Sequence, residues 1–153
     1  MTPHSPATAL PSGSASAPVS ARAKPRHEAP IVVVDDDPSL VESLLAVLRA
    51  EGYRAEGFTD PHTALARLRR GPRAALVLAD CVMPRMSGGE LLDALTASGV
   101  DTPVLLMTAL SDPNFCVRPG RATILSKPFS IDDLLAEIEA HVRPASVAAR
   151  ARS

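Results

Sequence analysis

Four places in the sequence put a chemically useful polar side chain at or just after the end of a short apolar run. Asp35 and Asp36 follow the first run, and Asp80 follows a later one. Thr108 ends a third run, and Lys127 comes two residues after the last. Three carboxylates with one ammonium and one hydroxyl suit a hard divalent cation such as Mg²⁺, which also relieves the repulsion between the carboxylates.

The same side chains are suited to phosphoryl transfer. An aspartate beside a divalent cation can act as a nucleophile that accepts a phosphoryl group. The metal and a nearby lysine neutralise charge on the transferring oxygens, while a hydroxyl donor holds one of them. Taken singly, Thr108 is an ordinary strand residue and Lys127 a solvated charge, so the hypothesis depends on the joint pattern.

The elements that must position these residues alternate between apolar runs and segments of helical period. This alternation indicates an α/β fold with a parallel sheet and crossover helices. Strands are expected at 31–34, 53–58, 74–79, 103–108 and 122–125, and helices at 38–50, 61–70, 88–98 and 131–143. Because the carboxyl ends of parallel strands share one edge, where ligands bind, the five polar side chains should converge there.

One helix is missing from the regular alternation. Between the fourth and fifth expected strands, the segment "SDPNFCVRPGRA" contains Pro113, Pro119 and Gly120 and has no apolar stripe. Proline and glycine disfavour a helix interior. We therefore expect an irregular or shortened fourth helix.

Several polar residues have the position of helix caps. Asp37 directly precedes Pro38, and Asp60 precedes Pro61, which is the order of a cap and a first helical residue. Ser87 begins the capping-box spacing S-x-x-E, and Ser130 precedes the last helix. Asp37 is therefore interpreted as a cap, in contrast to Asp35 and Asp36.

The distribution of charge and composition predicts one domain with two tails. Residues 1–29 are rich in Pro, Ser and Ala and are expected to be a disordered leader. Residues 144–153 are expected to be a short disordered basic tail, and residues 30–143 form the domain. The whole chain has a net charge of −1, but residues 30–143 carry −5. This acidity disfavours a nucleic-acid-binding core.

Cysteine spacing and hydropathy exclude several further classes. Cys81 and Cys116 lack C-x-x-C spacing and nearby histidines, so we expect free thiols and no zinc site. No run reaches the roughly 18 apolar residues of a membrane helix, and the N-terminus does not have the pattern of a secretory signal. A cytoplasmic protein without a membrane partner is expected.

At this point the chain resembles the receiver domains of two-component response regulators. The matching motifs are "VVVDDDP", "LVLADCVMPRMSG", "VLLMTA" and "ILSKPF", which lie in order at the ends of alternating strands within residues 30–143. The resemblance implies a flavodoxin-like (βα)5 fold, with a doubly wound parallel five-stranded sheet between two layers of helices. It implies a signalling domain, and no enzyme beyond promotion of its own phosphorylation and dephosphorylation.

The resemblance also implies roles for the polar residues. Asp80 should accept a phosphoryl group from the phosphohistidine of a sensor histidine kinase or a histidine phosphotransfer protein. Asp36 should bind Mg²⁺ directly, Asp35 mainly through a water, and the carbonyl of Val82 should be a further ligand beside Asp80. In the same family Thr108 and Lys127 contact the phosphoryl oxygens, and the Lys127-Pro128 bond is expected to be cis.

The expected output is a protein–protein contact with a downstream target. No direct DNA binding is expected, because residues 144–153 are too short to form a DNA-binding module. A homodimer is left open, because the surface that normally decides it is the one that departs from the family. The abbreviated fourth segment is similar to receivers of hybrid sensor kinases, although the sequence has no kinase core.

Two features depart from the family pattern. Ile124 occupies the switch position that usually holds Tyr or Phe, which puts the usual read-out in doubt. Val82 and Leu110 stand two residues beyond Asp80 and Thr108, where neither apolar side chain can orient a hydrolytic water. A slowly hydrolysing phosphoaspartate is therefore expected.

Two other classes of function fit this sequence less well. A metal-dependent phosphohydrolase of the haloacid-dehalogenase group needs a second aspartate two residues after its nucleophile, and Val82 stands there instead. A phosphorylation-independent binding module is supported by Ile124 and the irregular fourth segment. It is opposed by the complete acidic, Thr and Lys set.

Overall fold

The protein is described by a computed structural model that covers residues 28–112, 116–117 and 122–142. Its strands are β1 (Ile31–Val34), β2 (Ala55–Phe58), β3 (Leu76–Asp80), β4 (Val104–Thr108) and β5 (Thr123–Ser126). Its helices are α2 (Pro38–Ala50), α3 (Pro61–Arg70), α4 (Gly88–Ala97) and α5 (Ile131–His141). The strands form one sheet in the order β2-β1-β3-β4-β5, and every neighbouring pair is parallel.

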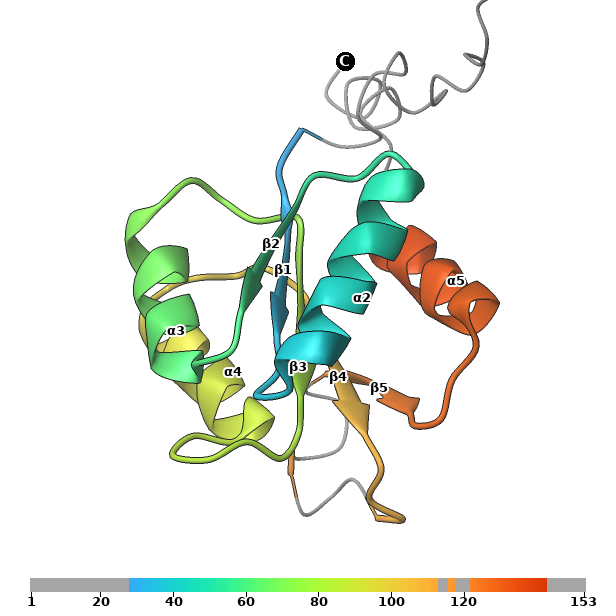
Figure 1. Ribbon diagram of the computed structural model, residues 1–153. Coiled ribbons are helices and arrows are strands. Elements are labelled where there is room, and N and C mark those ends of the chain that lie inside the picture. Colours follow the sequence, from blue (N-terminus) through green and yellow to red (C-terminus); the bar gives the residue numbers. More distant parts are fainter. Residues whose placement is uncertain (1–27, 113–115, 118–121, 143–153) are drawn as a thin grey trace, which may run out of the picture.

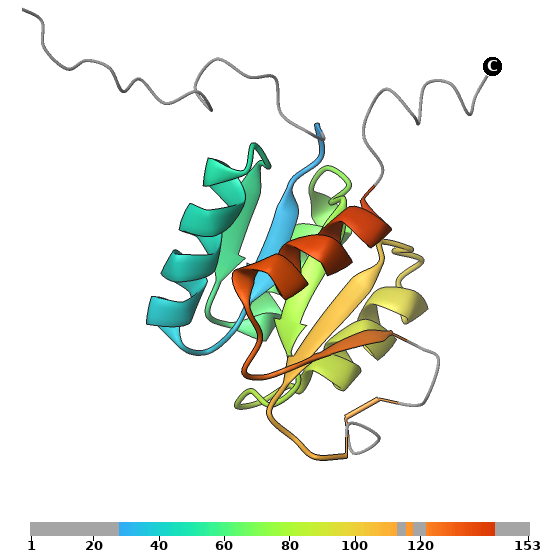
Figure 2. The same cartoon turned by 90° about the vertical axis from the view of Figure 1, so that its right-hand side faces the viewer.

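Helices cover both faces of this sheet. Helices α2 and α5 lie on one face, and α3 and α4 lie on the other (Figures 1 and 2). The expected flavodoxin-like fold, a parallel sheet between two helical layers, is thereby confirmed. The order of strands reverses between β1 and β3, which is where open α/β sheets place their ligand crevice.

The central strand β1 shows why its sequence is continuously apolar. Ile31 and Val33 pack into the core on the side of α2 and α5, whereas Val32 and Val34 pack into the core on the side of α3 and α4. All four side chains have 0% exposure. A strand covered on both faces has no solvent side, so the polar alternation of a half-exposed strand is absent.

The strand boundaries differ slightly from the expected ones. Strand β3 begins at Leu76 and not at residue 74, because the pairing with β1 starts at Ile31↔Leu76. Strand β5 ends at Ser126, one residue later than expected, because Thr108 of β4 pairs with Ser126. The first and last residues of a strand depend on the length of the strand beside it, and the local apolar pattern gives no information about that length.

The expectation of an irregular fourth helix concerns a segment that is only partly described. Residues 113–115 and 118–121 lie outside the described residues, and 109–112, 116–117 and 122 contain no helical residue. The predicted leader and basic tail also lie outside the described residues, apart from 28 and 29. Among the helices that the structure describes, none has the length and apolar character required to span a membrane.

The predicted capping residues occupy the N-termini of all four described helices. The Asp37 Oδ1 accepts hydrogen bonds from the backbone N–H groups of Ser39, at 3.0 Å, and Leu40, at 3.4 Å. Asp60 caps α3 in the same way, and the hydroxyls of Ser87 and Ser130 accept from amides in the first turns of α4 and α5. The interpretation of Asp37 as a helix cap is confirmed.

This cap gives a prediction for stability. Asp37→Ala should lower the free energy of unfolding by about 1 kcal/mol, because the first-turn amides of α2 lose their acceptor. Asp37→Asn keeps a capping oxygen and removes the charge, so its loss should stay below about 0.5 kcal/mol. Urea unfolding followed by circular dichroism measures both variants. Equal losses would show that the charge, and not the cap, stabilises α2.

Candidate functional site

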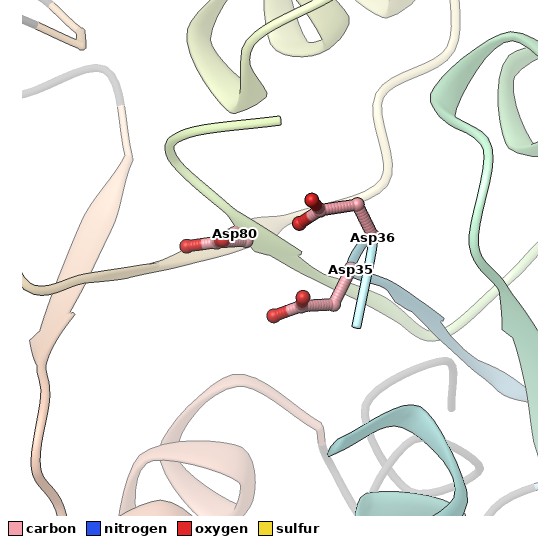
Figure 3. A group of neighbouring side chains, drawn as sticks. All are labelled: Asp35, Asp36 and Asp80. Atoms are coloured by element: carbon pink, nitrogen blue, oxygen red, sulfur yellow. The ribbon is translucent and has the colours of Figure 1, made fainter. Parts of the chain in front are cut away.

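Three carboxylates meet where the carboxyl ends of β1 and β3 lie side by side. Val34 pairs with Ala79 in the parallel register, so the next residues on the two strands, Asp35 and Asp80, are also neighbours. One ligand oxygen from each of Asp35, Asp36 and Asp80 lies within 4.8 Å of the others. Figure 3 shows the two residues from the end of β1 beside the one from β3. The structure brings together the acidic residues that the sequence singled out.

Lys127 reaches this cluster from the end of β5. Its Nζ lies 3.5 Å from Asp35 Oδ2 and 3.4 Å from Asp80 Oδ1. The backbone N–H of Lys127 donates to the carbonyl oxygen of Thr108 at 2.7 Å, which fixes the start of this segment against β4. The Lys127-Pro128 peptide bond is cis, as expected. One ammonium group therefore contacts two carboxylates from different strands.

Asp35 is the most deeply buried member of the cluster, with 1% exposure. Burial raises the pKa of its carboxyl above the usual value, and the negative charge of Asp80 adds to this effect. The backbone N–H of Asp37 donates to Asp35 Oδ1 at 2.9 Å. This hydrogen bond and the charge of Lys127 lower the pKa of Asp35 and so oppose the effect of burial. The ionised form of Asp35 is thus destabilised where it stands, and a bound cation would stabilise it.

The donor set fits a hard divalent cation. Asp36 is exposed and Asp80 is half-buried, so both can reach a ligand from solvent while Asp35 lies below them. The cluster holds three carboxylates, and the ammonium of Lys127 contacts two of them. Oxygen ligands with excess negative charge match the preference of Mg²⁺.

Thr108 lies at the end of β4, next to the cluster. Its side chain is fully buried, and its Oγ1 accepts a hydrogen bond from the backbone N–H of Leu110 at 2.9 Å. It is also hydrogen-bonded to the thiol of Cys81. The residue that pairs with Asp80 in the register is Met107, so Thr108 stands one position beyond Asp80 on the adjoining strand.

Three apolar residues were singled out around the site. Val82 and Leu110 are exposed, at 60% and 36%, whereas Ile124 is half-buried against the core on the side of α3 and α4. Val82 and Leu110 thus face solvent, and the expected slow hydrolysis of the phosphoaspartate stays a prediction. The expected role of the Val82 carbonyl as a metal ligand stays a prediction, as do the individual roles of the other site residues.

Gly88 has a structural role that the sequence did not reveal. A Cβ at this position would lie 2.5 Å from the carbonyl oxygen of Asp80 and 2.7 Å from Leu106 Cδ2. The N–H of Gly88 donates to the Cys81 carbonyl at 3.0 Å. The glycine therefore lets α4 begin directly against the end of β3. In the sequence, this role of Gly88 was signalled only by the place of the glycine in the "MSG" motif.

Sequence reasoning also missed the contact between the two cysteines. Cys81 is buried in the core on the side of α3 and α4. Burial raises the pKa of its thiol to about 12, and a hydrogen bond with the thiol of Cys116 contributes. Both cysteines are free thiols. No spacing rule links residues so far apart, so only the fold could show that they touch.

Known proteins with similar sequences are response regulators. Response regulator MprA of Mycobacterium leprae (strain TN) is 39% identical over 116 residues, covering 74% of this chain and 50% of MprA. The DNA-binding response regulator MtrA of Mycolicibacterium smegmatis is 39% identical over 117 residues, with the same two shares. The chain therefore spans about half the length of the curated relatives it matches.

A solved structure shares the fold. The response regulator protein TrrA of Thermotoga maritima, in complex with Mg²⁺-BeF, matches with a TM-score of 0.68 and 29% identity. The match covers 74% of this chain and 99% of TrrA.

The expectation of no direct DNA binding is wrong. MtrA is named as a DNA-binding response regulator, and the similarity to it covers only about half of its length. The expectation was argued from the acidity of residues 30–143 and from the shortness of residues 144–153. Neither property bears on what another part of such a protein contacts, because charge patterning reports only on the surface that carries it.

The family model agrees with the fold and the site. The model of the response regulator receiver domain matches residues 31–139, which include all five strands and all three carboxylates of the cluster. This span is most of the 153 residues of the sequence. The chain therefore belongs to the response regulator receiver domain family of two-component signal transduction.

Proposed function

We propose that this receiver domain accepts a phosphoryl group on Asp80 from the phosphohistidine of a sensor histidine kinase and signals by a change in its contacts with another protein. The observation that carries this proposal is the position of Lys127 Nζ, 3.4 Å from Asp80 Oδ1 and 3.5 Å from Asp35 Oδ2. Asp80 is thereby a half-buried carboxylate that has both an ammonium and two further carboxylates beside it.

In the proposed transfer, a carboxylate oxygen of Asp80 attacks the phosphorus atom. A bond forms between this oxygen and phosphorus, while the bond between phosphorus and the histidine nitrogen breaks and its electron pair stays on the nitrogen. Lys127 would pair with an oxygen of the transferred group, because its ammonium already contacts Asp80. Alignment and charge compensation are the whole contribution of the protein.

The acidic residues have complementary proposed roles toward Mg²⁺. Asp36 and Asp80 would bind the ion directly, Asp35 would act mainly through a water, and the Val82 carbonyl would be a further ligand. When bound, the ion would neutralise charge on the transferring phosphoryl oxygens. The complex of the related TrrA with Mg²⁺-BeF supports this choice of metal.

Thr108 is proposed to link phosphorylation to the output surface. Its hydroxyl accepts from the Leu110 N–H at the start of the segment between β4 and β5. A new hydrogen bond from this hydroxyl to a phosphoryl oxygen would compete with the bond from the Leu110 N–H. The competition would shift the conformation of the segment that begins at Leu110. Ile124 on β5 is half-buried and aliphatic, so we propose a read-out that does not use an aromatic ring at this position.

The proposed reaction moves a phosphoryl group from the donor onto the protein itself, and we propose no catalytic activity beyond its own phosphorylation and dephosphorylation. Val82 lies where a phosphohydrolase would need a second acid, and its exposed side chain supplies no proton. The alternative, a phosphorylation-independent binding module, keeps the same fold but gives no purpose to the carboxylates around Lys127. An experiment on phosphorylation separates the two.

Incubation with acetyl phosphate and Mg²⁺ should add one phosphoryl group to the wild-type protein. The intact mass measures the addition directly. Asp80→Asn should show none, because an amide oxygen is a poor nucleophile, and removal of the metal with a chelator should abolish the addition to the wild type.

Asp37→Asn is the matched control for this experiment. It also removes one carboxylate from the same acidic stretch, but Asp37 acts as a helix cap. It should be phosphorylated like the wild type. No mass increase in the folded wild type would contradict the proposal and favour the binding module.

The exposed apolar residues beside the site predict a long-lived phosphoaspartate. Val82→Asn should accelerate the loss of the phosphoryl group in the presence of Mg²⁺ by on the order of tenfold, since an amide can orient the attacking water and a tenfold change needs only about 1.4 kcal/mol. Ile131→Asn is the control, because Ile131 is similarly exposed, at 54%, on the first turn of α5. The decay is followed by intact mass. Equal decay in Val82→Asn and the wild type would show that Val82 does not limit hydrolysis.

A further inference from the structure

The two cysteines of this chain touch although they are far apart in the sequence. The Cys116 Sγ lies 3.6 Å from the carbonyl oxygen of Cys81. The neighbouring Cys116 thiol also contributes to the raised pKa of the Cys81 thiol. Cys81 follows Asp80 at the end of β3, whereas Cys116 belongs to the segment between β4 and β5. Neither residue has a part in the proposed phosphoryl transfer.

We propose that Cys81 and Cys116 form a reversible intramolecular disulfide when the protein is exposed to a peroxide. The observation that carries the proposal is the position of the Cys116 sulfur, 3.6 Å from the backbone carbonyl oxygen of Cys81, with both cysteines as free thiols. A pair of thiols in contact can be joined without large movement of the backbone.

The position of Cys81 is set by its backbone on both sides. Its N–H donates to the carbonyl oxygen of Met107 at 2.8 Å, and its own carbonyl accepts from the N–H of Gly88 at 3.0 Å. Its side chain is 1% exposed within the core on the side of α3 and α4. Cys81 is therefore a fixed partner, which Cys116 must approach.

Cys116 is placed by its contact with the start of α4. A Cβ at Gly89 would overlap the carbonyl oxygen of Cys116 and would lie 3.6 Å from its Sγ. The bare glycine lets Cys116 lie directly on the start of this helix. The absence of a side chain at Gly89 is thus a condition for the contact between the thiols.

The different burial of the two thiols gives the order of the reaction. Cys116 is half-buried and can meet a small oxidant, whereas Cys81 is shielded. The Cys116 sulfur attacks the peroxide, the O–O bond breaks, and a sulfenic acid forms with release of one water or alcohol. The Cys81 sulfur then attacks the sulfenic sulfur, the S–O bond breaks, and water leaves with the proton of Cys81. In total the peroxide accepts two electrons and the two thiol hydrogens.

The disulfide would join the residue after Asp80 to the segment that Thr108 also contacts. The hydroxyl of Thr108 is hydrogen-bonded to the Cys81 thiol and to the N–H of Leu110. A covalent bond at Cys81 would therefore lie between the phosphoacceptor strand and the β4–β5 connection. A reducing dithiol would reverse it by thiol–disulfide exchange.

Treatment of the reduced full chain with hydrogen peroxide tests the proposal. The sample is blocked with N-ethylmaleimide, and its intact mass is compared with that of an untreated sample. The wild type should lose both reactive thiols together, remain a monomer on a non-reducing gel, and regain both thiols after dithiothreitol. No phosphoryl donor is present, so the result does not depend on the proposed function.

Two variants make the test specific. In Cys81→Ser, Cys116 should stop at the sulfenic acid, which dimedone traps, because its resolving partner is absent. Gly89→Ala keeps both cysteines and favours the helix, but its methyl group displaces Cys116. Its yield of intramolecular disulfide should fall several-fold, with a matching rise in the dimedone adduct.

The proposal would be overturned by a wild type in which dimedone traps Cys116 as fully as in Cys81→Ser. Disulfide-linked dimers in place of the intramolecular bond would overturn it as well. A Gly89→Ala variant that closes the disulfide as completely as the wild type would show that the contact at the start of α4 does not bring the thiols together.

Discussion

The mutual repulsion of three carboxylates is the constraint on which the rest of this receiver depends. Asp35 and Asp80 are held next to each other because their strands pair in a fixed parallel register, and the backbone cannot relax to separate them. That register is stabilised by apolar side chains buried on both faces of the sheet. Lys127, which directly follows β5, compensates part of the negative charge of the three carboxylates. The remaining excess of charge is what makes the site suited to a cation.

Three consecutive aspartates have three different environments in this fold. Asp35 is buried and accepts the backbone N–H of Asp37, Asp36 is exposed beside the cluster, and Asp37 accepts amides from the first turn of α2. The transition from strand to helix within these residues turns each side chain in a different direction. Three neighbouring aspartates therefore have two functions: Asp35 and Asp36 bind the metal, as we propose, and Asp37 caps a helix.

Local signals predicted the helices better than the strands. Helix α2 runs from Pro38 to Ala50 as expected, because its cap and its first proline are adjacent in the sequence. Strand β3 begins later than expected, because its first residue is decided by the length of β1. The expectation about DNA was wrong for a related reason: it applied the charge of one surface to a protein that matches its relatives over only about half of their length.

The sequence by itself determined the alternation of strands and helices, and with it the convergence of Asp35, Asp36 and Asp80 at one edge of the sheet. It could do so because apolar periodicity and caps act over a few residues and parallel strands share their direction. Only the tertiary structure decided the burial of Asp35, the bridging position of Lys127 and the contact of Cys81 with Cys116. These features depend on how distant segments pack, and no local pattern records the distance between side chains that meet only in the folded chain.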